Sequence, residues 1–158
     1  MNLTSKSRYA LKIMLYLSCY SSKGLVNRHD ISSSEGIPEK YLDQILLKLR
    51  RSNLVESIRG RYGGYKISSD SEAISVWDIF RAVEDTIYPV ECVDEHEGQC
   101  ANSGACSTNE PWRFIFSLLQ NNLKEMSLKD LEVVVATSPT CNISSFKECR
   151  PGREPLRV

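Results

Sequence analysis

The chain of 158 residues contains no apolar segment close to the roughly 20 residues that a membrane-spanning helix requires. The apolar stretch that follows Lys6 and Arg8 is interrupted by Lys12 and continues as an amphipathic helix, so a cleaved leader is not expected. The sequence also lacks a nucleophile elbow, a phosphate-binding loop and an HExxH helix. We therefore expect a cytoplasmic protein, with reduced thiols, that is not an enzyme.

A net charge is also lacking, because the formal charge of the whole chain is zero. The two halves nevertheless differ in sign. Residues 1–70 carry 12 Lys and Arg against 6 Asp and Glu, whereas residues 71–158 carry 8 against 14. A basic half indicates a polyanionic partner such as DNA, and the alternative is chance scatter of solvated surface charge.

Hydrophobic periodicity predicts three helices in the basic half. The first covers about residues 4–22. Asn27 is a candidate N-cap for a short helix over 28–35, and Gly36 ends it. Pro38 suits the first turn of a third helix, whose expected apolar face comprises Tyr41, Leu42, Ile45, Leu46 and Leu49. Two short helices joined at 36–37, the second with a long polar face, are typical of a helix-turn-helix.

A β-hairpin is predicted next, with strands at 54–58 and 64–67. The connection at 59–63 contains glycines together with Arg59 and Arg61. An ordinary hairpin would explain the strands but not the two arginines at its tip, so we interpret it as the wing of a winged helix. Ser75 and Asp78 have the spacing of a capping box, which predicts another helix through Val83.

A long helix is predicted from about 109 to 126, with Asn109 or a neighbour as its N-cap and Pro111 in its first turn. Its apolar residues recur at heptad-like spacing: Trp112, Ile115, Phe116, Leu119, Leu123 and Met126. We expect this stripe to form a dimerisation surface, and the alternative is that it belongs to the core of one chain. Ser127 and Asp130 cap a last helix to about 136. The proline-containing tail is expected to be flexible.

Three of the six cysteines lie close together, in an acidic segment just after the predicted winged helix. Cys92, Cys100 and Cys106 span fifteen positions. Clustered thiolates usually hold an iron–sulfur cluster or zinc. A metal centre beside a nucleic-acid reader predicts a sensor whose DNA binding depends on that centre. Cys19 is expected in the core, and the two cysteines of the tail are expected to be exposed bystanders.

Several motifs occur together along residues 1–136. In chain order they are Leu3-Thr4-Ser5-Lys6, Arg8-Tyr9-Ala10, Gly36-Ile37, Tyr41-Leu42-x-Gln44, Leu54-Val55-x-Ser57-x-Arg59-Gly60-x-x-Gly63-Gly64-Tyr65 and Ala82-Val83-Glu84. With the three cysteines, they closely resemble the IscR/NsrR/CymR superfamily of winged helix-turn-helix transcription regulators, and its iron–sulfur branch in particular. The resemblance implies a homodimer that binds a pseudo-palindromic double-stranded operator, with the third helix in the major groove and the wing in the minor groove.

The resemblance also implies particular DNA contacts. Asp43, Gln44 and Arg59 match the family positions, Lys40 is expected to add a phosphate contact, and Arg61 lies beside Arg59 in the wing. The family typically has glutamate at position 43. Because aspartate is one methylene shorter, we expect a different reach and a different preferred operator. The alternative is a solvated helix face on which Lys40 and Asp43 form an i,i+3 pair.

A 2Fe–2S cluster held by Cys92, Cys100 and Cys106 is the cofactor that the resemblance implies, with 4Fe–4S or zinc as alternatives. The family places a histidine ligand three residues after the last cysteine, where this chain has an asparagine, a poor iron ligand. The fourth ligand is therefore open between three residues: Glu110, His96 and Asn109.

We thus expect a mainly α-helical protein with a small β-hairpin wing. The expected parts are a winged helix-turn-helix domain (1–86), a cluster-binding loop (87–108), a dimerisation helix with a terminal helix (109–137) and a flexible tail (138–158). The first functional hypothesis is a cluster-dependent regulator that senses cluster supply or redox state. The alternative is a winged-helix regulator with zinc or no metal, switched by thiol oxidation or by a protein partner.

Overall fold

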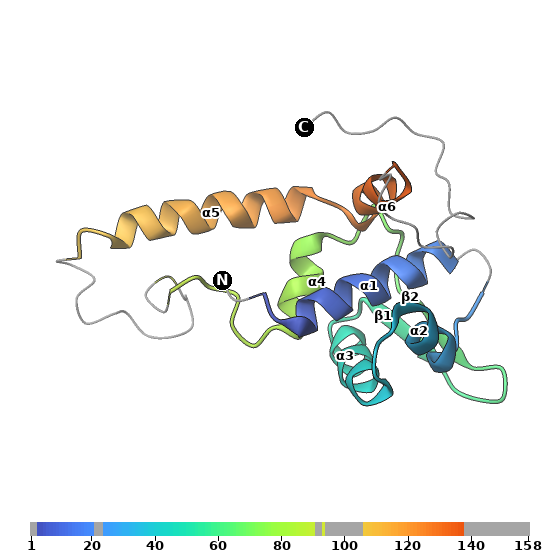
Figure 1. The fold of residues 1–158 in the computed structure, drawn as a ribbon. Coiled ribbons are helices and arrows are strands. Elements are labelled where there is room, and N and C mark those ends of the chain that lie inside the picture. Colours follow the sequence, from blue (N-terminus) through green and yellow to red (C-terminus); the bar gives the residue numbers. More distant parts are fainter. Residues whose placement is uncertain (1–2, 21–23, 91–92, 94–105, 138–158) are drawn as a thin grey trace.

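The computed structural model describes residues 3–20, 24–90, 93 and 106–137, and the predictions for Cys92, His96, Cys100 and the tail 138–158 lie outside these ranges (Figure 1). Its helices are α1 (Ser5–Tyr20), α2 (Arg28–Glu35), α3 (Glu39–Arg51), α4 (Val76–Val83), α5 (Asn109–Glu125) and α6 (Leu128–Thr137). An antiparallel hairpin of β1 (Val55–Ile58) and β2 (Gly64–Ile67) separates α3 from α4. None of the described helices is long and apolar enough to cross a membrane.

The helix-turn-helix forms where the capping residues predict it. The side chain of Asn27 accepts a hydrogen bond from the backbone N–H of Asp30 at 2.9 Å. Gly36 ends α2 with a φ of 63°, a left-handed conformation that glycine adopts without steric cost. Pro38, expected in the first turn of α3, is instead its N-cap with a ψ of 131°, because α3 begins one residue later.

The core of the winged domain is built around α1, which packs against α2, α3, β2, α4 and α6. Its fully buried large side chains include Ile13, Met14, Leu17, Leu42, Leu46, Leu49, Ile79 and Leu128. Each such side chain contributes about 1.5–3 kcal/mol when it is fully removed from water. Cys19 is buried, as predicted, but Tyr41 is not part of the core face of α3. The Tyr41 side chain is 50% exposed and its ring meets that of Tyr9 edge-on at 6.2 Å.

The hairpin is tied to the beginning of α2. Its register pairs Val55 with Ile67 and Ile58 with Gly64. Beyond the two strands, Val26 exchanges backbone hydrogen bonds of 2.9 and 2.8 Å with Tyr65. A side chain on Gly63 would collide with the carbonyl oxygen of Ile58, so the turn requires glycine there. The wing is therefore held at a defined position beside α2.

Helix α5 extends away from the winged domain (Figure 1). Phe116 is buried, and its ring lies 5.9 Å from that of Trp77 and 5.0 Å from that of Tyr88. Most of the predicted stripe is exposed, including Trp112, Ile115 and Leu119. Two further apolar residues of α5, Phe114 and Leu118, are also exposed. The stripe is therefore not explained as core of a single chain.

The ends of α4, α5 and α6 test the predicted caps. Ser75 and Asp78 form the expected capping box of α4. Ser127 and Asp130 do the same for α6, where the Ser127 hydroxyl accepts from the Asp130 backbone N–H at 3.1 Å. The N-cap of α5 is Thr108, so Asn109 is the first helical residue rather than the cap.

Candidate nucleic-acid interface and metal centre

The outer face of α3 carries three of the predicted site residues. Lys40, Asp43 and Gln44 stand at positions i, i+3 and i+4, so they share one side of the helix, and all three are exposed. The opposite side of α3 is buried in the core. Burial of that apolar face therefore directs these polar side chains outward.

Asp43 pairs with Arg28 at the start of α2. The Nη1 atom of Arg28 lies 3.2 Å from Oδ1 and 3.0 Å from Oδ2 of Asp43. Its Nη2 atom is 3.7 Å from a carboxylate oxygen of Glu39. The hydrogen bond with Asp43 raises the pKa of Arg28 above its ordinary value. The alternative of an i,i+3 pair with Lys40 is thus not what the structure shows for Asp43, because a guanidinium from the neighbouring helix pairs with its carboxylate.

Arg28 is a residue that the sequence analysis missed. It precedes Asp43 by fifteen positions, so no helical or strand spacing links the two. The turn at 36–37 brings the start of α2 beside the first half of α3. The available signal was a positively charged residue at the first position of α2, a helix whose only core apolar side chain is Ile31.

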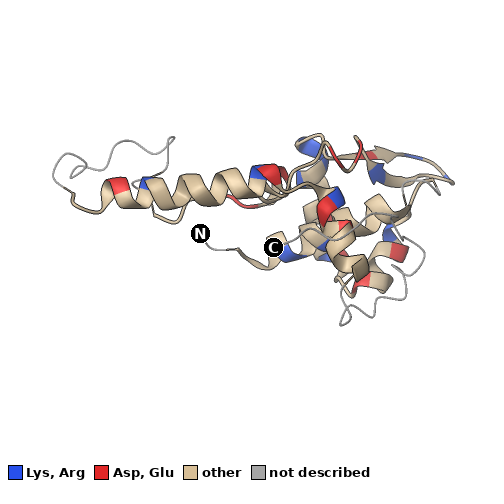
Figure 2. Cartoon of the chain, turned by 90° about the horizontal axis from the view of Figure 1, so that it is seen from above, with Lys and Arg blue, Asp and Glu red and all other residues tan. Residues whose placement is uncertain are grey.

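The wing presents its arginines to solvent. Arg59 and Arg61 are both exposed in the turn between the strands. The guanidinium carbon of Arg61 lies 5.8 Å from the ring centroid of Tyr62, which is 84% exposed. Lys and Arg residues thus lie on the hairpin, at the end of the molecule opposite to α5 (Figure 2).

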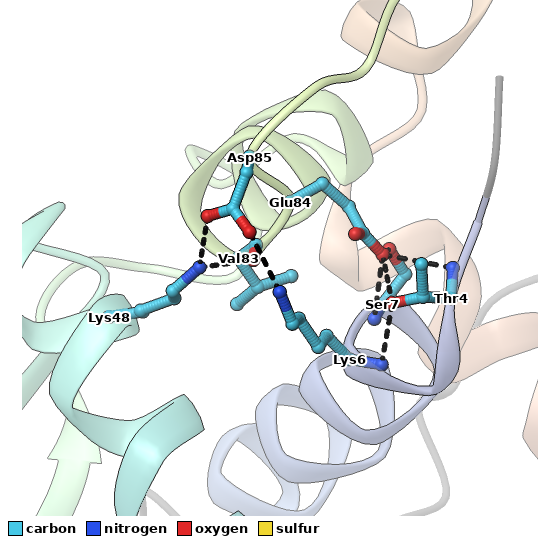
Figure 3. A network of polar contacts seen from close by, with 7 residues as sticks. All are labelled: Thr4, Lys6, Ser7, Lys48, Val83, Glu84 and Asp85. Atoms are coloured by element: carbon cyan, nitrogen blue, oxygen red, sulfur yellow. Dashed lines mark hydrogen bonds and ion pairs between the residues drawn. The ribbon is translucent and has the colours of Figure 1, made fainter.

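A polar junction joins α3 to the segment that leaves α4 (Figure 3). Lys48 donates to Asp85 at 2.7 Å and to the carbonyl oxygen of Val83 at 2.8 Å. Lys6 of α1 donates to the other oxygen of Asp85 at 2.8 Å. The hydrogen bonds from Lys48 and Lys6 lower the pKa of Asp85 to about 2. The carboxylate of Asp85 therefore connects α1 and α3 at neutral pH.

Glu84 fastens the same segment to the first turn of α1 (Figure 3). One of its carboxylate oxygens accepts from the backbone N–H and the hydroxyl of Thr4, at 3.0 and 2.8 Å, and from Ser7. Burial by itself would raise the pKa of Glu84, but the hydrogen bonds from Ser7 and Thr4 outweigh it and lower the pKa. The chain that leads toward the cysteine segment thus begins with two anchored carboxylates.

Of the three predicted thiolate ligands, the described residues include Cys106 alone, since Cys92 and Cys100 lie outside them. The Sγ atom of Cys106 is exposed and lies 3.3 Å from the Thr108 hydroxyl oxygen. That hydrogen bond, together with the backbone N–H groups of Thr108 and Asn109, lowers the pKa of the Cys106 thiol. A thiol stabilised as thiolate at the start of a helix suits a metal ligand.

Asn109 and Glu110 differ in their availability as a fourth ligand. Asn109 is 6% exposed, and its Oδ1 atom accepts from the Nε atom of Arg113 at 3.1 Å. Because an Arg Nε only donates, the atom facing it is the oxygen, which is therefore already engaged. Glu110 is exposed in the first turn of α5. Within the described ranges no three metal-binding side chains form a group, and the predicted candidate His96 falls outside them.

Comparison with known proteins identifies the type of protein. The sequence pattern of Rrf2, described as an iron-dependent transcriptional regulator, matches residues 3–133. The chain belongs to the Rrf2 family. Among its curated relatives, the HTH-type transcriptional regulator IscR of Vibrio vulnificus (strain YJ016) is 37% identical over 131 residues, which cover 83% of this chain and 77% of the relative.

Solved structures agree with this Rrf2 assignment. CymR, the global cysteine regulator of B. subtilis, has 34% sequence identity and a TM-score of 0.66, covering 83% of this chain and 95% of that one. The oxidized form of Staphylococcus aureus CymR has 27% identity and a TM-score of 0.65 with the same coverage. The expected winged helix-turn-helix fold is confirmed, and this Rrf2 protein is a DNA-binding transcriptional regulator rather than an enzyme.

Proposed function

We propose that this Rrf2 regulator binds its operator as a homodimer and responds to an iron–sulfur cluster held by Cys92, Cys100 and Cys106. The observation that carries the proposal is the placement of three cysteines within fifteen residues, ending three positions before α5, in a chain 37% identical to IscR. A 2Fe–2S cluster is favoured over 4Fe–4S. We infer a cytoplasmic protein, because thiols there stay reduced and available to iron.

The residues around Cys106 suit such a group. Its exposed thiol lies just before the N-terminus of α5, where backbone N–H groups favour an anionic ligand. Glu110 is the preferred fourth ligand in this proposal, since the oxygen of Asn109 already accepts from Arg113. When bound, the cluster supplies a centre that can be lost or oxidised, and this would change the order of residues 87–108.

The junction around Glu84 and Asp85 is the proposed route from that loop to DNA. Both carboxylates lie immediately before the loop and hold the start of α1 and Lys48 of α3 (Figure 3). A loop that changes its order would pull on this junction. Because Lys48 belongs to the helix that carries Asp43 and Gln44, a shift of the junction would move the recognition surface.

The dimer and its docking on DNA complete the proposal. The exposed apolar stripe of α5, with Ile115 and Leu119 at its centre, would be covered by the same stripe of a second copy. In each copy α3 would enter the major groove, with Lys40, Asp43 and Gln44 toward the DNA, and the wing arginines would reach the minor groove. Two copies would read a pseudo-palindromic operator.

Anaerobic purification tests the cluster. We expect coloured protein with visible absorption, about two irons per chain and matching sulfide. Cys100→Ala should lose the colour, whereas Cys149→Ala, a matched control in the tail, should keep it. Glu110→Ala should change the absorption spectrum, whereas His96→Ala should leave the spectrum unchanged. The reverse result would assign the fourth ligand to His96.

The same measurement separates a second candidate function, in which the protein carries zinc or no metal and is switched by thiol oxidation. The similarity to the structure of oxidized S. aureus CymR and the exposed thiol of Cys106 favour this alternative. If the protein is colourless, with or without stoichiometric zinc, and its DNA affinity changes on oxidation of Cys106, this second function replaces the cluster proposal.

A further inference from the structure

A basic groove lies between the start of α2, the end of α3 and the wing. Three arginines from these three elements line it, Arg28, Arg50 and Arg59, together with Asn27 and Ser57. Its volume is about 360 Å³. None of the described residues that line the groove is acidic. Such a concentration of guanidinium groups in one concave surface attracts an anion.

Two of the arginines are held in place by hydrogen bonds. The Nη1 atom of Arg28 donates to both carboxylate oxygens of Asp43, at 3.0 and 3.2 Å. Arg50 donates from its Nη1 atom to the Ser57 hydroxyl of β1 at 3.2 Å. A guanidinium has five N–H donors, so each arginine retains donors beyond these bonds. Their planar fork matches the oxygens of a phosphate group.

The position of the groove indicates which anion it meets. With α3 in the major groove and the hairpin in the minor groove, one sugar–phosphate backbone must pass between the two elements, because the backbone separates the two grooves. The basic groove occupies that position. We propose that Arg28 and Arg50 bind a phosphate of the operator backbone there, beside the point where Arg59 of the wing reaches the minor groove, and that Asp43 is the positioning residue of Arg28. This inference rests on the proposed docking of α3 and the wing.

The test uses a random-sequence DNA duplex, because a phosphate contact does not depend on base sequence. Each neutralised phosphate contributes about 0.9 to the slope of the logarithm of affinity against the logarithm of salt concentration. Arg28→Ala and Arg50→Ala should each weaken binding several-fold and lower this slope, and the double variant should lower it by about 0.9 for each subunit that contacts the DNA. Arg81→Ala removes the same charge from α4, outside the groove, and should leave the slope unchanged.

The conservative variant Arg50→Lys, which keeps the charge, should retain the slope. Slopes for Arg28→Ala and Arg50→Ala equal to that of Arg81→Ala would overturn the inference. If Arg59→Ala still reduced the slope in that case, the docking of the wing would stand while the groove proposal failed. If no variant, Arg59→Ala included, changed the slope, the docking itself would be wrong. Neither result would affect the colour of the protein, so the cluster proposal is judged separately.

Asp43 has its own readout. As a positioning residue it should support binding, so Asp43→Asn should weaken duplex binding in the parent protein and have no further effect in the Arg28→Ala background. If Asp43 only repelled phosphate, Asp43→Asn would strengthen binding instead, which contradicts the positioning role.

A free phosphate group shares the chemistry of the backbone phosphate. Inorganic phosphate is therefore added to the parent protein at matched ionic strength. A rise in Tm that Arg28→Ala abolishes, with an unchanged salt slope for the duplex, would assign the groove to a small phosphate-bearing ligand and overturn the DNA proposal. No change in Tm, with the reduced slopes, supports backbone binding.

Discussion

In the winged domain most of the large apolar side chains of α1, α3 and α4 are buried, with Tyr41 and Leu47 of α3 as exposed exceptions, whereas α5 exposes most of its own. Leu46 of α3 is 2% exposed and Leu119 of α5 is 40% exposed, although both belong to amphipathic helices. The winged domain therefore buries most of its large hydrophobic side chains within one chain. Helix α5 buries apolar side chains within the chain at Phe116 and partly at Leu123, and the exposed rest of its stripe suits a partner surface.

The two regions also differ in the distribution of their charged side chains. Charged side chains on α5 are confined to its two ends, and its middle, residues 114–123, contains none (Figure 2). Helices α2 and α3 and the wing expose many charges, several of them in pairs such as that of Arg28 with Asp43. A region without charge suits burial against a second copy, and a region with paired and unpaired cations suits a polyanion.

The largest expected effect comes from the core of the winged domain. Leu46→Ala should lower the free energy of unfolding by about 2–5 kcal/mol, since a buried leucine leaves a cavity. Its neighbour Leu47 is 39% exposed and provides the matched control. Leu47→Ala should cost less than about 0.5 kcal/mol. Urea denaturation of both variants measures the contrast, and equal losses would contradict the burial pattern.

A smaller effect is expected for α5, and it should appear in association rather than in folding. Leu119→Asp removes an apolar side chain whose burial against a second copy is worth about 1.5–3 kcal/mol per subunit. Light scattering should show a monomer in place of a dimer, with little change in the unfolding of the winged domain. Asn121→Asp introduces the same charge at an exposed polar position of α5 and should leave the dimer intact. A dimer unaffected by Leu119→Asp would mean that the stripe does not form the interface.

The smallest effect concerns the junction between the two regions. The pKa of Asp85 is about 2 in the folded protein and near 3.9 in an unfolded chain, so the ionised carboxylate stabilises the fold at neutral pH. This contribution is present above about pH 4 and is lost as the pH falls through 2. Because Asp85 is exposed, we expect Asp85→Asn to cost only about 0.2–1 kcal/mol at pH 7.

Urea denaturation of Asp85→Asn and the parent at pH 7, 4 and 2 measures that difference, which should shrink toward the lowest pH. Asp70→Asn, at an exposed turn after β2, serves as the control and should not show this trend. A difference that grows on acidification would reverse the sign and exclude stabilisation by the ionised carboxylate.

Much of the fold follows from local sequence chemistry. The caps at Asn27, Ser75 and Ser127 each act within one helical turn, so their residue types and spacing predicted where α2, α4 and α6 begin. The glycines of the wing predicted its turn, and the period of the apolar residues predicted the helices, in the same local way. Such features are readable from sequence because their partners lie within three or four positions.

The prediction for Tyr41 needed correction because it depends on a neighbour far away in the sequence. Tyr41 has the helical spacing of a core residue, but its ring meets that of Tyr9 at the surface. The N-cap of α5 was predicted at Asn109 or a neighbour, and the neighbour Thr108 occupies it, while the Asn109 side chain accepts from Arg113 one turn along the helix. For Tyr41, tertiary packing decided between two uses of the same side chain.

The sequence by itself determined the Rrf2 architecture, the basic first half and the cysteine segment, because periodicity, caps and composition are properties of neighbouring residues. Only the tertiary structure decided that Arg28 holds Asp43 and that Arg50 and Arg59 share one groove with it. It also decided that Glu84 and Asp85 join α1 to α3. These contacts link residues fifteen or more positions apart along the chain, or from separate elements, and they form only when the helix-turn-helix and the hairpin pack around α1.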